Sequence, residues 1–390
     1  MNDRDIIAPP QLQPRYRYKI HDKLYDLTDF VKIHPGGQDM FNNLKPDTNI
    51  TPMIYAYHKN PKSILAMLPK YEVPSTEVKI EYDTNYTYDK YCELKKLVYD
   101  EIHEKKIPLY WSNKEISYNA FMLSVYLGMW GYCFWNTNNL SYWLMVLMGC
   151  FTVGWGVLVF HETSHYGGFK NQKYNLLISH LMPFFNNNHW KFHHNYLHHC
   201  FTNTDDDYDL FPNEVFRLSN KVSLTGYHKY QYIYTNITFT IVGLFARHVN
   251  ISMRQSNKFV LIILCYILGI KILLFFSVCG FLFASIAFLS HIQHECIQLN
   301  NDKKNDFLYN QVSSSMNYRT DDFITRFICF GLDIQTEHHL FPNIPHSSLR
   351  QIQYIVRSYC EKNDIPYIEK SSIFPAIYSY ICYLYKMGNP

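Results

Sequence analysis

The sequence predicts a small α+β domain at the N-terminus, followed by an all-α membrane domain with a metal centre and a cytosolic helical cap. Three observations lead to this class. Residues 15–75 alternate short strand-like and helix-like pieces around turn signals such as Pro35-Gly36-Gly37. Apolar blocks of about 20 residues, enough to cross a bilayer, begin near Ile116. Eight histidines crowd into residues 161–199, directly after one of these blocks.

The chain divides into five segments by composition. The charged run Glu93-Leu94-Lys95-Lys96 predicts a solvated helix in a linker before the membrane. The net charge of +3 gives no sign of a nucleic-acid partner, and the scattered cysteines predict free buried thiols. We expect a flexible arm at 1–14, the α+β domain at 15–75, a linker with a pre-membrane helix at 76–115, the membrane domain at 116–366 and a C-terminal tail at 367–390.

About four transmembrane helices are expected, in two hairpins. Residues 116–135 and 140–160 are each close to the ~20 residues that span a bilayer, and a short uncharged turn separates them. We interpret the apolar block 259–290 as a second hairpin with Lys271 near its far turn. A single crossing there would put the last histidine cluster on the other side of the membrane from the first two.

The polar segments indicate how the chain is oriented in the membrane. Residues 161–258 hold nine Lys or Arg, which favours the cytosolic side, and the N-terminus lacks the apolar core of a signal peptide. Two partly apolar stretches, 174–185 and 230–246, are expected to lie along the interface. We therefore expect a multi-pass integral membrane protein with both termini and all histidine clusters in the cytosol.

The first histidine pair lies in the N-terminal domain. The motif Ile33-His34-Pro35-Gly36-Gly37 is followed 24 residues later by His58, and Tyr25-Asp26-Leu27-Thr28-Asp29-Phe30 precedes it. Over roughly residues 15–72 this pattern resembles cytochrome b5. The resemblance implies that His34 and His58 are the two axial ligands of a haem b. When protein fills both axial positions, the haem suits electron transfer rather than oxygen chemistry.

Three further histidine motifs follow the apolar blocks. They read His161-x-x-x-His165, His194-x-x-x-His198-His199 and Gln335-Thr-Glu-His338-His339. Spacings of three and four residues put side chains on one face of an α-helix. From about residue 116 to 366 the chain resembles the membrane fatty-acid desaturases, and Gln335 with the N-terminal domain resembles the front-end acyl desaturases. The resemblance implies seven iron ligands: His161, His165, His194, His198, His199, His338 and His339.

One more ligand is expected after the second hairpin. The family often has a histidine at the place of His291, which we favour, and His294 is nearly as plausible on spacing. Gln335 is a candidate weak ligand or supporting group, and His193 is a candidate supporting group. The remaining nearby side chains are expected to have no metal role: His180, His189 and His346 as interfacial or hydrogen-bonded residues, and Asp205-Asp206-Asp207 as a solvated turn.

The resemblance implies O₂-dependent desaturation of a fatty acyl chain, held as acyl-CoA or acyl lipid, with no catalytic side chain beyond the metal ligands. It implies two non-haem irons, with electrons from NAD(P)H through a separate cytochrome b5 reductase, because the chain has no dinucleotide-binding glycine motif. It also implies polyunsaturated fatty acid biosynthesis, contact with membrane lipid and, in a eukaryote, the endoplasmic reticulum. The alternatives are a di-iron lipid hydroxylase and a b5-type electron-transfer protein with an inactive desaturase domain.

Overall fold

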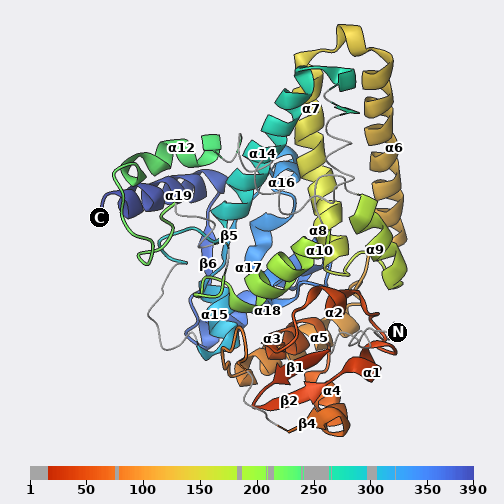
Figure 1. Cartoon of the computed structure of the whole chain (residues 1–390), viewed down its shortest axis with the longest axis vertical. Helices are drawn as coiled ribbons and strands as arrows, with labels where there is room; N and C mark the ends of the chain where they lie inside the picture. Colours follow the sequence, from red (N-terminus) through yellow and green to blue (C-terminus); the bar gives the residue numbers. More distant parts are fainter. Residues whose placement is uncertain are drawn as a thin grey trace, which may run out of the picture.

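The structure is a computed structural model, and it describes most of the chain. The described residues are 16–74, 79–181, 187–207, 209, 215–238, 240, 263–264, 266–296, 305–320 and 322–390. The expected arm at 1–14 lies outside them, as do parts of the apolar stretches that begin at residues 230 and 259. Long helices form one end of the molecule, the N-terminal unit forms the other, and the remaining helices lie between and beside them (Figure 1).

The N-terminal unit combines a four-stranded sheet with short helices, as the alternating sequence pattern predicts. The strand order is β3-β1-β2-β4, with β1 Arg17–Ile20, β2 Lys23–Asp26, β3 Thr48–Asn49 and β4 Glu72–Val73. β1 and β2 form an antiparallel hairpin, and β3 pairs parallel to β1. The helices are α1 Thr28–Val31, α2 Asp39–Asn43, α3 Thr51–Tyr57 and α4 Pro61–Met67, with a 3-10 turn at Leu68–Tyr71.

The local conformation around His34 explains why two glycines, Gly36 and Gly37, follow it. Gly37 has a φ of +84°, a conformation that side chains rarely adopt. A Cβ atom on Gly36 would lie 2.8 Å from Cε1 of His34, so only glycine leaves room for the imidazole ring. On the other side of the unit, α3 ends at Tyr57 and His58 follows in extended backbone. The sequence thus sets both histidines at the ends of short elements.

Helix α5, Asp89–Glu104, packs one face into the protein, so the solvated helix expected from its charges is only partly correct: Glu93 and Lys96 are exposed, but Lys95 is buried. Leu94 lies on a buried face, and Lys95 is buried beside it with 2 % of its surface exposed. The Lys95 ammonium donates to the backbone oxygens of Tyr55 and His58. Burial lowers the pKa of Lys95 to about 7, and the side chain offsets part of its burial by donating to carbonyl groups at the end of helix α3.

Three long helices form the apolar end of the molecule. The first is α6, Asn113–Trp135, and the third is α14, Lys271–Leu289. The second runs from Tyr142 to Ser164 and consists of α7 (Tyr142–Phe151), the π-helical segment η3 (Thr152–Val157) and α8 (Leu158–Ser164). Among the described residues, Tyr142–Ser164 and Lys271–Leu289 are long and apolar enough to cross a membrane. Helix α6 has the length, but polar side chains in its first two turns lower its mean hydropathy. For two of the roughly four expected crossings, the described chain therefore contains a helix of suitable length and composition.

Helices α7 and α14 lie side by side (Figure 1) and approach each other closely at Gly149. A Cβ atom there would come within 2.7 Å of Cγ1 of Val278, so a larger residue would push the helices apart. At the outer end, the Lys271 ammonium donates to the backbone oxygen of Leu140 at 2.7 Å. This contact brings the start of α14 beside the turn between α6 and α7, where the hairpin interpretation expects Lys271.

The remaining helices form a cap between the long helices and the N-terminal unit. They include α15 Phe307–Ser313, α16 Phe323–Ile328, α17 Gln335–Leu340 and α18 His346–Lys362, and strand β5 Met316–Tyr318 pairs parallel to β6 Ile368–Lys370. The expected C-terminal tail is instead β6 followed by helix α19, Ile373–Gly388, which contacts α12, Gln231–Thr238. Ala376, Tyr380 and Leu384 recur every four residues and are buried, which explains why this segment folds onto the body.

The N-terminal unit and the cap share a hydrophobic core. One continuous cluster of buried residues includes Ile54 of α3, Leu94 of α5, Tyr196 and Leu340. The Tyr196 hydroxyl also donates to the backbone oxygen of Asn49 at 2.9 Å. The unit is therefore fixed against the helices that carry the histidine motifs.

Candidate metal centre

The three histidine motifs lie on separate elements that converge beneath the long helices. His161 is on α8, with His165 directly after it. His194 and His198 are on η4 (Lys191–His198), a π-helical segment, and His199 begins the short helix α11 (His199–Phe201). His338 and His339 are on α17. The structure brings these seven residues into one buried region, as their order along the chain predicts.

The first cluster contains five imidazoles. One ring nitrogen from each residue lies within 4.8 Å of all the others: His161, His165, His194, His199 and His338. The Nε2 atom of His194 is 2.9 Å from that of His161 and 3.2 Å from that of His199. Burial lowers the pKa of His194 well below its ordinary value, so the ring stays neutral. Neutral nitrogens crowded at this separation form a donor set that can hold a metal ion.

The π-helical winding decides which residues meet. In an α-helix, His194 would share a face with His198, four residues later. In η4 the turns are wider. The rings of His194 and His198 still stack, with centroids 5.3 Å apart at 22°, but His194 shares the first cluster with His199, five residues later, whereas His198 joins a second cluster. The α-helical spacing argument therefore holds for the proximity of His194 and His198, but it does not predict that they belong to different clusters. π-helical turns are rare overall and are frequent at functional sites.

The second cluster contains His198, His291 and His339, whose ligand atoms also lie within 4.8 Å of one another. Each ring is held through Nδ1. His291 Nδ1 is 2.9 Å from the backbone oxygen of Ser314, and His339 Nδ1 is 3.0 Å from Oε1 of Gln311. These contacts put the ring proton on Nδ1 and leave the Nε2 lone pairs for a metal.

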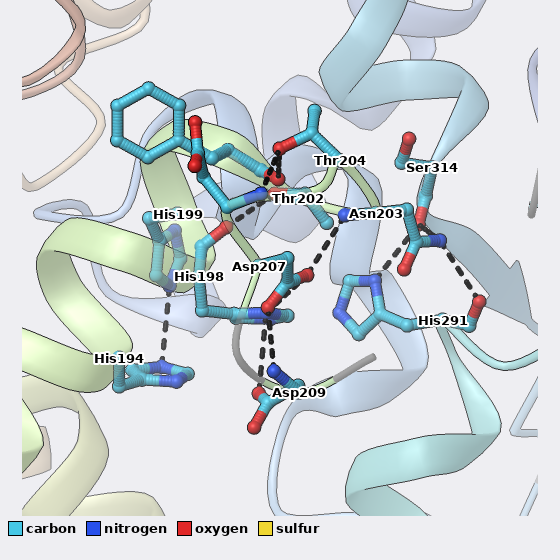
Figure 2. Close-up of polar contacts among 12 residues, drawn as sticks. His194, His198, His199, Thr202, Asn203, Thr204, Asp207, Asp209, His291 and Ser314 are labelled. Atoms are coloured by element: carbon cyan, nitrogen blue, oxygen red, sulfur yellow. Dashed lines mark hydrogen bonds and ion pairs between the residues drawn. The ribbon is translucent and has the colours of Figure 1, made fainter. Parts of the chain in front are cut away.

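Aspartates hold the remaining ring of the second cluster. Figure 2 shows Asp207 and Asp209 beside Nδ1 of His198, at 3.3–3.4 Å. Asp207 is buried, and it also accepts from the backbone N–H of Asn203 at 2.8 Å. Its carboxylate raises the pKa of His198 against the effect of burial. The solvated turn expected here is therefore wrong for Asp207, whose role as a support for His198 the local sequence did not signal.

The candidates left open by the sequence differ sharply in position. His291 joins the second cluster, whereas His294 is exposed. Gln335 is buried, its Nε2 is 2.9 Å from Nε2 of His291, and its Oε1 has no hydrogen-bond partner among the described residues. His193 contacts Asp209 at 2.8 Å and lies outside both clusters. The geometry favours His291 and Gln335 for the metal centre.

His346 lies closer to the centre than its sequence position suggested. Its ring stacks on that of His338, with centroids 5.0 Å apart at 17°. The Glu162 carboxylate accepts from both the backbone N–H and Nδ1 of His346, at 2.7 and 2.8 Å, and from the Trp111 indole. His346 is thus a buried support for the first cluster. By contrast His180 is exposed and its Nδ1 lies 2.7 Å from the backbone oxygen of Leu176, in agreement with the hydrogen-bonded role expected for it. The side chain of His189 lies outside the described residues.

The second site lies between His34 and His58. The two rings stand at 83° with their centroids 6.1 Å apart. Each Nδ1 faces a backbone oxygen at 3.1 Å, Gly37 for His34 and Ile54 for His58, so each Nε2 keeps its lone pair. Burial lowers the pKa of His58 to about 4. Because imidazole binds metals at about 2.0–2.1 Å, the spacing suits two axial ligands of one haem iron.

The geometry defines a protein with buried, histidine-rich sites that can hold metal, and comparisons with known proteins give its class. The fatty acid desaturase family model matches residues 137–371. The chain therefore belongs to the fatty acid desaturase family, and its class is that of the acyl desaturases.

Similar proteins extend over most of the chain. Acyl-lipid (8-3)-desaturase B of Dictyostelium discoideum is 25 % identical over 95 % of this chain and 90 % of its own length. Delta(8)-fatty-acid desaturase of Euglena gracilis is 24 % identical over 93 % of this chain and 91 % of its own length. sn-1 linoleoyl-lipid 6-desaturase of Arthrospira platensis is 26 % identical over 63 % of this chain and 79 % of its own length.

Proposed function

We propose that this protein introduces a double bond into a fatty acyl chain, with two iron ions held by the two histidine clusters. The observation that carries the proposal is the contact between the clusters. His199 of the first cluster stacks on His339 of the second, with centroids 4.3 Å apart at 19°. Two metal positions so close together suit the shared reduction of one dioxygen molecule.

The residues divide into two ligand sets. His161, His165, His194, His199 and His338 would hold one iron, and His198, His291 and His339, with Gln335 nearby, would hold the other. Bound iron supplies the activation of dioxygen that removal of hydrogen from an unactivated CH₂–CH₂ unit needs. The protein orients the rings through Asp207, Ser314 and Gln311, and it keeps the site dry because the ligands are buried.

The electron balance requires an external donor. The acyl chain gives up two electrons and two protons, two more electrons and two protons come from outside, and one dioxygen becomes two water molecules. We infer that the N-terminal unit is a cytochrome b5-like domain with haem b held by His34 and His58. It would receive electrons from NAD(P)H through a separate cytochrome b5 reductase. The fit of the two rings to a shared iron supports this inference.

The names of the similar proteins support a front-end acyl desaturase that acts in polyunsaturated fatty acid synthesis. We further propose a membrane protein with the metal centre and both termini in the cytosol, in the endoplasmic reticulum of a eukaryote. The two apolar helices Tyr142–Ser164 and Lys271–Leu289 support the membrane placement. The Lys271–Leu140 contact supports a hairpin whose turn lies on the far side.

Product analysis tests the proposal. The full chain would be expressed in a host supplied with defined unsaturated acyl chains, and products would be located by mass spectrometry, with a His199→Ala variant as the control. We expect a new double bond on the carboxyl side of an existing one, absent from the variant. A hydroxylated product, or no product from iron-loaded protein with every candidate chain, would contradict the proposed reaction.

A further inference from the structure

Tyr57 connects the two sites that the proposed function assigns to haem and iron. It is the last residue of α3, next to His58 in the chain. Its hydroxyl oxygen lies 2.8 Å from Nδ1 of His165, a residue 108 positions away, and the two rings are inclined by only 23°. Among residues 16–74, Tyr57 is the only described residue that hydrogen-bonds a histidine of either cluster.

The protonation of His165 fits this contact. Nε2 of His165 is buried and has no hydrogen-bond partner among the described residues, and it belongs to the first cluster. A histidine that binds a metal through Nε2 carries its proton on Nδ1. The His165 Nδ1–H group then donates to the Tyr57 hydroxyl oxygen. The path from His58 to the cluster therefore consists of covalent bonds and a single hydrogen bond.

The surrounding interface holds Tyr57 in this position. The Asn343 side chain donates to the Tyr57 backbone oxygen at 3.0 Å. Asp39 of α2 forms an ion pair with the fully buried Lys191 of η4, and the Tyr166 hydroxyl donates to the same carboxylate at 2.9 Å. Because Tyr166 immediately follows His165, these contacts fix the N-terminal unit against the turn that carries His165.

We propose that Tyr57 provides the route by which electrons pass from the haem domain to the first metal cluster. The proposal rests on the proposed function, in which His34 and His58 hold haem and His165 holds iron. In each transfer, a ferrous haem held by His34 and His58 would give up one electron, and a ferric iron held by the first cluster would accept it. Two such transfers supply the two external electrons of a turnover. Tyr57 undergoes no net oxidation. Its role is to connect His58 with His165 through covalent bonds and one hydrogen bond, so that electrons need not cross an unbonded gap.

Haem reoxidation measures this step directly. The purified full-length enzyme, loaded with haem and iron, would be reduced without oxygen and mixed with oxygen and substrate. The decay of the ferrous haem spectrum would be followed by stopped flow. The test variant is Tyr57→Phe, which keeps the ring and removes the hydroxyl. The matched control is Tyr55→Phe on the same helix, whose hydroxyl faces His21 at 3.3 Å instead of the cluster.

We expect Tyr57→Phe to slow haem reoxidation roughly ten- to a hundredfold per iron-loaded molecule. Its haem spectrum and haem content should be unchanged, and Tyr55→Phe should match the wild type. A wild-type rate in iron-loaded Tyr57→Phe would overturn the proposal, as would a variant that only loses iron and keeps its rate per remaining centre. A wild-type protein that binds no haem, or whose ferrous haem is not reoxidised, would instead contradict the proposed function itself.

Discussion

The side-chain amide of Gln335 lies 2.9 Å from Nε2 of His291, although 44 residues separate them in the chain. The second cluster has three imidazoles where the first has five, and Gln335 lies beside one ring of the smaller set. Rotation of the Gln335 amide by half a turn exchanges its oxygen and nitrogen with almost no change in shape. This rotation would turn the oxygen toward the cluster.

Replacement of Gln335 should therefore affect the second metal. We expect Gln335→Ala to lower activity about tenfold or more, with loss of up to one iron per chain, because the second iron loses a neighbouring polar group. Gln335→His should retain more activity than Gln335→Ala, because imidazole can fill the same place. Iron analysis together with product yield checks both. A Gln335→Ala enzyme with full activity and full iron would show that the amide has no metal role.

His291 and His294 provide a matched pair on one segment. His291→Ala removes a ring of the second cluster and should abolish desaturation, with iron content falling from two per chain toward one. His294→Ala changes an exposed side chain and should leave both values unchanged. Metal analysis of the purified variants distinguishes them. Equal loss of iron and activity in the two variants, or loss only in His294→Ala, would contradict the assignment of His291 to the second cluster.

His346 should matter although it belongs to neither cluster. His346→Ala removes a ring that stacks on His338, and it leaves Glu162 with one partner fewer. We expect a partial loss, about tenfold in activity, with weakened iron retention during chelation. His180→Ala, which changes an exposed histidine, is the control and should behave as wild type. Wild-type iron retention in His346→Ala would contradict a supporting role.

Acid should release haem through His58. Burial lowers its pKa from 6.5 to about 4, so the folded protein keeps the ring neutral between these pH values, where the unfolded chain takes up a proton. The stability of the folded protein therefore falls as the pH decreases from 6.5 through about 4. The protonated ring cannot bind iron, so the low-spin haem spectrum should disappear over the same window or below it. His58→Ala should show no such spectrum at neutral pH, whereas His21→Ala should keep it. An unchanged spectrum well below pH 4 would contradict axial ligation by His58.

Much of the metal centre was predictable, because its ligands cluster in short motifs beside apolar segments. The convergence of His161, His194 and His338 follows from the placement of their motifs beside apolar segments. The family assignment is confirmed by the family model. The partition of the rings between two clusters was not predictable, because it depends on π-helical winding in η4, which leaves no known signal in the residues.

Two failures elsewhere concern charged residues that the local sequence places in solvent but the fold buries, Lys95 and Asp207. Lys95 meets the end of α3, 37 residues away at His58, a contact that becomes visible only when the tertiary structure is known. Asp207 meets His198, only nine residues away, in a turn whose shape the run of aspartates did not signal. His346 was expected to be interfacial or hydrogen-bonded, and it hydrogen-bonds Glu162, 184 residues away.

The hydrophobic core shared by the N-terminal unit and the cap has a kinetic consequence. A haem domain on a flexible tether would search for its acceptor, and the rate would depend on tether length. Here the two units are packed together, so the proposed transfer would need no such search, and dilution would not slow it because it would be intramolecular. Delivery of reducing equivalents from a separate reductase would remain bimolecular. At low reductase concentration that collision, and not the internal transfer, would set the rate of turnover.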